Sequence, residues 1–218
     1  MSKIKVGVFD SGVGGQSVIN AIRKEISDLE IIYKDDKAHV PYGSRSVAQI
    51  HEFVRPIFRE FIDDGCEAVI IACNTVTTNL IEGLRQEFDI PMVGMEPAVK
   101  PAAQQTGSGV IAVCATPRTL SSKRYRWLKE NYADDVEVLE PDCSDWALMV
   151  EQNRIEREKV ADTIEEVISK KADVIVLGCT HYHWIEELIR DVAAGRAEVI
   201  QPEAPVVAQL KLVLGQLA

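Results

Sequence analysis

Short runs of apolar residues alternate with longer amphipathic segments along the whole chain. The apolar runs are rich in valine and isoleucine, and they predict strands at residues 4–9, 30–33, 68–72, 91–94, 109–115, 136–140, 173–178 and 198–200. Most of them lack the apolar–polar alternation of a half-exposed strand, which is typical of strands covered on both faces. The pattern therefore predicts an α/β fold with mostly parallel sheets flanked by helices.

The clearest predicted helix lies between residues 46 and 65. Ser46 and Gln49 have the spacing of a capping box, and Gly65 follows the last turn. One apolar stripe at helical spacing is formed by Val47, Ile50, Phe53, Val54, Ile57, Phe58, Phe61 and Ile62. A stripe of this width is typical of a helix with one face in a core.

The chain also repeats itself coarsely. The segments KVGVFDSGVGG and SGVIAVCATPRTLSS both run from a predicted strand into a loop, and each is followed at a similar distance by a strand that ends in a cysteine. This repeat predicts two similar doubly wound domains, related by a pseudo-twofold axis, with a site between them. Because VGMEPAVKPAAQQTGSG is rich in turn residues, we place the first domain at residues 1–95 plus 206–218 and the second at residues 96–205.

Composition narrows the range of partners. The 218 residues carry a formal net charge of −10, which argues against nucleic acid and against anionic membrane surfaces, since both need a basic face. The longest apolar runs are far shorter than the roughly 20 residues of a membrane span. A small anionic substrate remains compatible, because a few local donors can outweigh a distant average charge.

The five cysteines form an odd set with no CxxC pair and no Cys/His zinc pattern. The segment MSKIKVGVFD enters a strand-like run without the apolar region of a signal peptide. We therefore expect a reduced cytoplasmic protein with free thiols and no metal. Cys66, Cys114 and Cys143 are interpreted as small buried apolar side chains.

Polar clusters follow several predicted strands, at the edge where open α/β sheets bind ligands. They are Asp10-Ser11-Gly12, Pro41-Tyr42-Gly43-Ser44, Cys73-Asn74-Thr75, Thr116 with Thr119, and Cys179-Thr180-His181. Each cluster alone has an ordinary alternative, because Asp, Ser and Thr after a strand commonly cap helices. Five clusters at one edge favour a ligand site. The glycines of DSGVGG do not spell GxGxxG, so they do not indicate a dinucleotide cofactor.

Cys73 and Cys179 stand at matching strand-to-helix corners. A helix N-terminus lowers the pKa of a thiol below its ordinary value of about 8.5, which makes the thiolate accessible near neutral pH. If the two halves face each other, the two sulfurs flank one small molecule. A thiolate and a thiol on opposite faces of a carbon can remove a proton and deliver another, which inverts the stereocentre. A redox dithiol is the competing interpretation, but it normally has CxxC spacing.

Two further titratable residues lie near these corners in the sequence. His181 is two residues after Cys179, and Glu151 lies in LMVEQN on a predicted helix. Each can tune a thiol or carry a proton, and each has a surface or capping role as its alternative.

Taken in order, the segments VGVFDSGVGG, PYGSRS, ACNTVTT, EPAVKPA, ATPRT, LMVEQN and LGCTHYH resemble those of the glutamate racemases. The resemblance covers nearly the whole chain. It implies a cofactor-independent racemase of two α/β domains that supplies D-glutamate for peptidoglycan. It also implies that Cys73 deprotonates the D-isomer and Cys179 the L-isomer.

The same resemblance assigns the remaining site residues. It implies that Asp10, Glu151 and His181 assist the two cysteines. The positions that would hold the substrate are Asp10, Ser11, Pro41, Tyr42, Gly43, Cys73, Asn74, Thr75, Thr116, Thr119, Cys179, Thr180 and His181. Without a cofactor as electron sink, hydroxyl and backbone N–H donors must stabilise the carbanion-like charge at Cα.

The chain departs from the family pattern at four places. His183 replaces a usual proline, Arg118 stands where a small residue is common, QPEAP fills residues 201–205, and the chain ends after a helix near residue 217. These departures concern the contacts between domains or subunits, and a homodimer is left open. The alternatives are an aspartate or other amino-acid racemase of the same superfamily, or a non-catalytic protein that binds an amino acid or a partner. His181 favours glutamate, because aspartate racemases tend to read GCTE at this motif.

Overall fold

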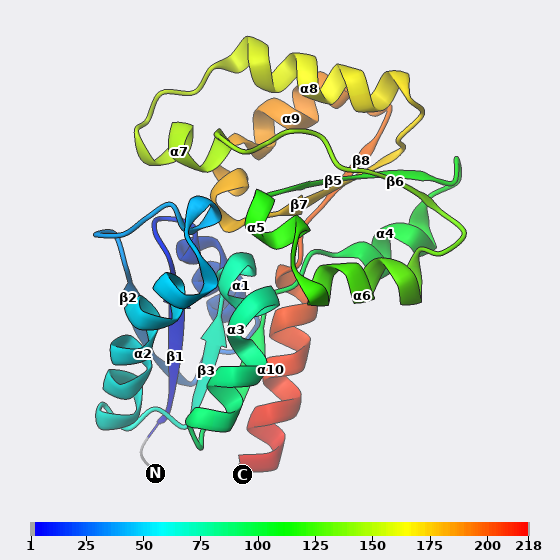
Figure 1. Cartoon of the computed structure of the whole chain (residues 1–218). Helices are drawn as coiled ribbons and strands as arrows, with labels where there is room; N and C mark the ends of the chain where they lie inside the picture. The colour runs from blue at the N-terminus through cyan, green and yellow to red at the C-terminus, as the bar shows by residue number, and fades with distance from the viewer. Residues whose placement is uncertain (1–2, 218) are drawn as a thin grey trace.

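The computed structural model of the chain describes residues 3–217. Within this range, two parallel sheets of four strands each form the frame of the molecule (Figure 1). The first sheet has the order β2-β1-β3-β4, built from β1 (Ile4–Asp10), β2 (Leu29–Asp35), β3 (Ala68–Ile71) and β4 (Met92–Gly94). The second has the order β6-β5-β7-β8, built from β5 (Val110–Ala115), β6 (Glu137–Leu139), β7 (Val174–Gly178) and β8 (Glu198–Ile200).

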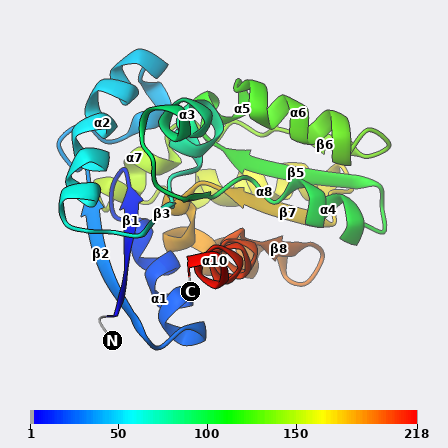
Figure 2. The same cartoon turned by 90° about the horizontal axis from the view of Figure 1, so that it is seen from below.

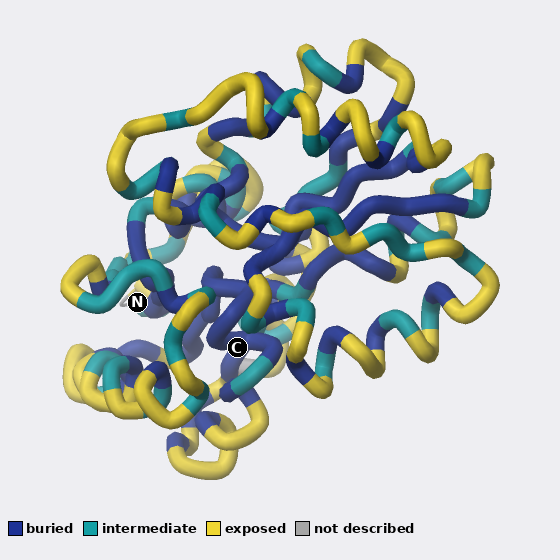
Figure 3. The backbone as a smooth tube through the Cα atoms, turned by 45° about the horizontal axis from the view of Figure 1, so that its top comes forward, coloured by how far each residue is buried: buried dark blue, intermediate teal, exposed yellow. Residues whose placement is uncertain are grey.

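The strands lie where the sequence predicts them, and all neighbours pair in parallel. The inner strands β3, β5 and β7 are buried along their whole length, which explains their uninterrupted apolar runs. Figure 3 shows this buried interior in dark blue, surrounded by helices and loops with exposed outer faces. The predicted α/β fold class is confirmed.

Helices cover both faces of the first sheet. Helices α2 (Val47–Asp63) and α3 (Asn74–Glu87) pack on one face, and α1 (Gly15–Glu25) packs on the other beside α10 (Glu203–Leu217). Figure 2 shows α10 nearly end-on next to α1. Helix α10 contributes Val206, Val207 and Leu210 to the core of this half, although it follows the second sheet in sequence. The domain boundaries after residue 95 and before residue 206 stay predictions.

The second sheet is covered in the same way. Helices α4 (Val99–Gln105) and α6 (Lys123–Tyr132) pack on one face, and the other face carries α7 (Trp146–Glu151), α8 (Arg157–Ser169) and α9 (Glu186–Ala193). Three short elements complete the chain, η1 (Tyr42–Ser44), α5 (Pro117–Leu120) and the 3₁₀ helix η2 (Thr180–Ile185). No helix within residues 3–217 combines the length and the apolar content that a bilayer crossing requires.

Helix α2 begins and ends as its sequence predicts. Ser46 Oγ accepts the N–H of Gln49 at 3.2 Å, and Gln49 Oε1 accepts the N–H of Ser46 at 3.0 Å, which completes the capping box. Gly65 follows the last turn with a φ of 76°, a conformation that glycine adopts without strain. The apolar stripe buries Ile50, Val54, Phe58 and Phe61.

The two halves share one strand order. In each half the first strand lies between the second and the third, and the fourth lies beside the third. Strand β1 therefore corresponds to β5, and β3 corresponds to β7. The repeat that the sequence predicts is present in the topology, and it places the two cysteine corners at equivalent ends of β3 and β7.

Candidate active site

Cys73 and Cys179 follow the third strand of their own halves. Cys73 is the N-cap residue of α3, and Cys179 is the N-cap residue of η2. Their exposed fractions are only 4% and 7%. The loop after β1 touches both corners, because Ser11 Oγ lies 3.4 Å from Cys73 Sγ and the adjacent Asp10 accepts the hydroxyl of Thr180, which follows Cys179. The arrangement therefore brings two buried thiols to one place from opposite halves of the molecule.

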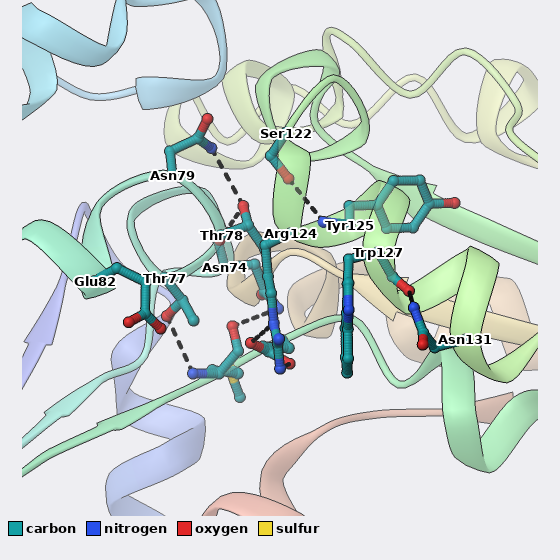
Figure 4. A network of polar contacts seen from close by, with 12 residues as sticks. Asn74, Thr77, Thr78, Asn79, Glu82, Ser122, Arg124, Tyr125, Trp127 and Asn131 are labelled. Atoms are coloured by element: carbon teal, nitrogen blue, oxygen red, sulfur yellow. Dashed lines mark hydrogen bonds and ion pairs between the residues drawn. The ribbon is translucent and has the colours of Figure 1, made fainter.

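The Cys73 corner is held by contacts with the first strand and with the crossover to the second half. Ser11 Oγ lies 3.4 Å from Cys73 Sγ. Asn74 Nδ2 donates to the carbonyl of Met95 at 3.1 Å, and the N–H of Met95 donates to Thr77 Oγ1 at 3.1 Å (Figure 4). Asn74 Oδ1 is buried and has no hydrogen-bond partner among residues 3–217, so it is an acceptor that a bound ligand can satisfy.

The expected lowering of the pKa is wrong for Cys73. Burial raises the pKa of this thiol to about 12, and the carboxylate of Asp10 adds to the rise. The hydroxyl of Ser11 and the backbone N–H of Val76 act in the opposite direction. The N-terminus of α3 is present as predicted, but loss of hydration and a nearby negative charge outweigh its effect.

Asp10 organises the loop after β1 and links the two halves. Its Oδ2 accepts the N–H groups of Gly12 and Gly14 at 2.9 and 3.1 Å. Its Oδ1 accepts the hydroxyl of Thr180 at 2.9 Å, and Thr180 follows Cys179 directly. Asp10 has no exposed surface, and its bond to Thr180 ties the loop after β1 to the Cys179 corner.

His181 lies between Cys179 and Glu151. Its Nδ1 is 3.7 Å from Cys179 Sγ, and its Nε2 is 2.5 Å from Glu151 Oε1. Glu151 stands at the end of α7, as predicted, and also accepts the N–H of Val13 at 3.2 Å. The predicted pair of auxiliary residues is therefore joined into one chain of contacts that ends at the second thiol.

The electrostatics of this chain favour a charged imidazole. Burial lowers the pKa of His181, but hydrogen bonds to Cys179 and Glu151 outweigh it and raise the pKa to about 11. The hydrogen bond from His181 lowers the pKa of Glu151, against the effect of burial. An imidazolium between a carboxylate and a sulfur is consequently the stable form at neutral pH.

The segment after Cys179 differs from the predicted amphipathic α-helix. It first forms the 3₁₀ helix η2, and α9 begins only at Glu186. Side chains three positions apart share one side of a 3₁₀ helix, which places Tyr182 and Ile185 in the same core. The hydroxyl of Tyr182 also donates to the carbonyl of Cys143 at 2.8 Å. These buried contacts favour the tighter turn over a regular helix start.

A layer of hydroxyl groups joins the halves next to Cys73. Thr75 Oγ1 lies 3.0 Å from Thr116 Oγ1 and 3.3 Å from Thr119 Oγ1. A Cβ atom on Gly43 would stand 2.9 Å from the Cβ of Thr116, so glycine lets the loop that carries Tyr42 approach α5 closely. Thr119 and Tyr42 are almost wholly buried, with exposed fractions of 0% and 2%.

The structure brings the predicted site residues to one region between the halves. Pro41 lies half-buried just before η1, next to Tyr42. Two positioning residues have no counterpart in the predicted set. Tyr33 donates its hydroxyl to the carbonyl of Gly12 at 2.7 Å, and Asp36 accepts the hydroxyl of Tyr42 at 2.5 Å. Asp36 directly follows β2, so its position at a strand end is a signal in the sequence, whereas Tyr33 has none.

The other three cysteines are small buried side chains, as the sequence analysis interprets them. Cys66, Cys114 and Cys143 are buried, with exposed fractions of 9%, 0% and 1%, and each packs in an apolar core. Burial raises the pKa of Cys66 to about 11. These thiols fill space in the two cores.

Arg118 contacts the first half, and His183 contacts the start of α10. Arg118 Nε donates to the carbonyl of Arg45 at 2.9 Å. His183 Nδ1 lies 2.6 Å from Oε1 of Glu203, which is the first residue of α10. The contact of Arg118 joins the two halves, and the contact of His183 joins η2 to the helix that returns to the first sheet.

Two cysteines thus stand at equivalent strand ends of two α/β halves with the same strand order, in contact with a set of residues that includes Ser11 and His181. The sequence profile described as Asp/Glu/Hydantoin racemase matches residues 14–210. The chain therefore belongs to the Asp/Glu/hydantoin racemase family.

Within this family, the chain is similar to several glutamate racemases. A glutamate racemase of Ectopseudomonas mendocina is 38% identical over 99% of this chain and 84% of its own length. Among solved structures, Escherichia coli glutamate racemase in complex with L-glutamate and the activator UDP-MurNAc-ala superposes with a TM-score of 0.84, at 31% identity over 98% of this chain and 83% of that one. Francisella tularensis glutamate racemase in complex with D-glutamate gives a TM-score of 0.81, at 28% identity over 99% and 82%.

Proposed function

We propose that this chain interconverts L- and D-glutamate without a cofactor, with Cys73 and Cys179 as acid and base on opposite faces of Cα. The observation that carries the proposal is the placement of two buried thiols at equivalent ends of β3 and β7. The similarity to glutamate racemases over nearly the whole chain supports glutamate as the substrate. In this role the protein supplies D-glutamate for peptidoglycan.

The proposed reaction moves one proton from one sulfur to the other. A thiolate takes the Cα proton and becomes a thiol, and the opposite thiol gives its proton to the other face and becomes a thiolate. The electron pair left at Cα is delocalised into the substrate carboxylate. Thr75 and Thr116 lie near Cys73 and supply hydroxyl groups for this negative charge, whereas the buried Oδ1 of Asn74 can accept a hydrogen bond from the substrate ammonium group.

His181 has a separate part in this proposal. Its imidazolium lies 3.7 Å from Cys179 Sγ and can balance a thiolate there. Glu151 stabilises the positive ring at 2.5 Å on its other side. On the opposite thiol, Ser11 opposes the rise in pKa that burial causes. The two sulfurs therefore have different partners for the same task.

The low exposure of both thiols favours removal of the Cα proton of the substrate, which is a very weak acid. Water around a thiolate would stabilise it and reduce its basicity toward Cα, whereas a dry site keeps the protein dipoles close to the reacting atoms. With 4% and 7% exposure, the thiols are reached by substrate only when the halves separate. Substrate entry and catalysis thus require an opening and closing motion.

Deuterium exchange at Cα tests the proposal directly. D- and L-glutamate, and separately aspartate, are incubated with the protein in D₂O and followed by NMR. We expect exchange and inversion with glutamate, and loss of racemisation in Cys73→Ala and in Cys179→Ala. Cys66→Ala is the matched control, because this buried thiol lies in the core of the first half and should leave turnover unchanged.

The outcomes separate the alternatives. Exchange with aspartate alone contradicts glutamate as the substrate. Absence of exchange with any amino acid contradicts the enzyme assignment and favours a protein that only binds an amino acid or a partner. Normal turnover in either cysteine variant contradicts the two-base mechanism.

A further inference from the structure

His183 and Glu203 form a largely buried contact between η2, which follows Cys179, and α10. His183 Nδ1 lies 2.6 Å from Glu203 Oε1, and their side chains are only 8% and 12% exposed. His183 stands in η2, four positions after Cys179, whereas Glu203 is the first residue of α10. A pair this well buried is expensive to break, because removal of one partner leaves the other without compensation.

The contact joins η2 to the first turn of α10, a helix whose later residues pack in the first half. Around His183, η2 is fixed in the second half, since Tyr182 is fully buried and its hydroxyl donates to the carbonyl of Cys143. Beyond Glu203, α10 packs Val206 and Leu210 into the core of the first half. The contact therefore ties η2 to the point where the chain returns from the second sheet to the first.

Neighbouring side chains secure the same return segment, residues 199–203. Gln201 Nε2 donates to Glu186 Oε2 at the start of α9. Arg190 pairs with Glu186 and donates to the carbonyl of Val199 at 2.7 Å. The η2–α9 segment, which carries the catalytic corner at its beginning, is thus attached to the return segment at several points.

We propose that His183 and Glu203 are positioning residues that brace the Cys179 corner against the return segment and α10. The proposal deepens the proposed function, because it rests on Cys179 being one of the two acid/base groups. It also accounts for two sequence departures together, since the unusual histidine contacts the unusual QPEAP turn. Without the brace, η2 keeps its contacts through Thr180 and Tyr182 but loses its contact with α10, so Sγ of Cys179 is held less firmly at its distance from the reacting carbon.

The geometry specifies which substitutions keep the brace. Only Nδ1 of His183 contacts Glu203, and Nε2 is buried with no hydrogen-bond partner among residues 3–217. An asparagine side chain places its amide nitrogen close to the position of Nδ1 and leaves out Nε2. His183→Asn should therefore preserve the contact, whereas the similarly sized His183→Leu and the uncharged Glu203→Gln should remove or weaken it.

The test measures racemisation together with the accessibility of Cys179. Purified variants are compared for kcat and KM with glutamate, and for the rate at which iodoacetamide alkylates Cys179, quantified on its peptide by mass spectrometry. For His183→Leu we expect kcat to fall roughly ten- to a hundredfold with KM little changed, the order that a misplaced catalytic group produces. Alkylation of Cys179 should accelerate severalfold, and His183→Asn should restore both quantities toward the wild-type values.

Controls separate bracing from general destabilisation. Glu25→Gln removes a different ion pair of α10, with Lys211 at 2.8 Å, and should leave kcat and Cys179 alkylation unchanged. Alkylation of Cys66 in every variant should also be unchanged. If His183→Leu does not fold, kcat and Cys179 alkylation are compared between His183→Asn, which keeps the contact, and Glu203→Gln, which weakens it.

The result that would overturn the brace is unchanged Cys179 alkylation and unchanged kcat in both His183→Leu and Glu203→Gln. Equal acceleration of Cys66 and Cys179 would also overturn it, because that pattern indicates global loosening. The alkylation measurement needs no substrate. A wild-type protein that lacks racemase activity but shows selective exposure of Cys179 in these variants would refute the proposed function and leave the brace intact.

Discussion

The two thiols carry the same chemistry in unlike surroundings. Cys73 lies beside a hydroxyl and near the carboxylate of Asp10, so its partners are neutral or negative. Cys179 lies beside His181, and Cys179 is itself one of the groups that raise the pKa of that imidazole. Two halves with the same strand order therefore give the two proposed acid/base groups different neighbours. Both thiols can serve one reversible reaction, but each depends on a different neighbour.

Ser11 should set how readily Cys73 ionises. In Ser11→Ala the hydrogen bond at 3.4 Å is lost, and with it an effect that lowers the pKa of Cys73. The pKa should rise further, and a lost hydrogen bond of about 1 kcal/mol corresponds to roughly fivefold less thiolate at a given pH. The alkylation rate of Cys73 as a function of pH checks this. Ser121→Ala, which removes an exposed hydroxyl, should show no change.

His181 should make stability depend on pH above neutrality. Its pKa is raised to about 11 in the folded state, against about 6.5 for an ordinary histidine. Between these values His181 holds a proton in the folded protein that it lacks in the unfolded chain, so its contribution to stability falls as pH rises, by up to about 1.4 kcal/mol per pH unit. The contribution is complete below pH 6.5 and is lost as pH rises through the folded pKa.

Urea unfolding of the wild type and of His181→Gln at several pH values between 6 and 10 measures this effect. The free energy of unfolding of the wild type should decrease more steeply with pH than that of the variant, because only the wild type releases this proton. Parallel curves would show that the imidazole is neutral in the folded protein.

At the scale of elements, local signals decide how well the sequence predicts the structure. Strands β3, β5 and β7 are continuous apolar runs, so their burial and parallel pairing follow from the pattern alone. The segment after Cys179 is different. Its 3₁₀ geometry depends on the contact of Tyr182 with the carbonyl of Cys143, which is distant in sequence. A contact between residues so far apart in sequence produces no hydrophobic pattern around Cys179 from which it could be predicted.

In the candidate site, too, the features with a local signal could be predicted from the sequence and those that depend on long-range contacts could not. Strand ends mark where polar residues gather, and this is why Asp10, Cys73 and Cys179 stand out in the sequence. The pKa of Cys73 could not be predicted in this way, because it depends on how far the closed halves exclude water. Tyr33, which donates to the carbonyl of Gly12, looks like any other side chain of a strand.

Helix α2 offers an independent test of a local signal. Ser46→Ala removes the side-chain oxygen that accepts the N–H of Gln49, and N-cap losses of this kind cost about 1 kcal/mol. The free energy of unfolding from denaturant titration should fall by that amount, with racemisation unchanged. Ser169→Ala is the matched control, because its exposed hydroxyl only donates to the carbonyl of Glu166 at the end of α8. An equal loss in both variants would contradict a specific cap.

For the whole molecule, the decisive quantity is how closely the halves approach. Asp10 accepts the hydroxyl of Thr180, Glu151 accepts the N–H of Val13, and both contacts cross between the halves. Gly14 lies at the centre of this contact. A Cβ atom there would stand 2.6 Å from the backbone carbonyl carbon of Thr180, so no rotation of a side chain could relieve the clash.

Gly14→Ala should therefore separate the halves at the Cys179 corner. Gly14 has a φ of −74°, so alanine fits the local backbone and only the opposing half is displaced. Overpacking of this kind destabilises by about 1–3 kcal/mol, and a shift near 1 Å between the thiols should lower kcat by roughly a hundredfold.

Gly83→Ala makes the same chemical change inside α3, where no atom lies within 4 Å of the new Cβ. Because alanine favours a helix over glycine by about 1 kcal/mol, this control should raise the melting temperature and leave kcat unchanged. A lower melting temperature in Gly14→Ala and a higher one in Gly83→Ala would locate the closure of the halves at Gly14. Full activity of Gly14→Ala would show that catalysis does not need this close approach.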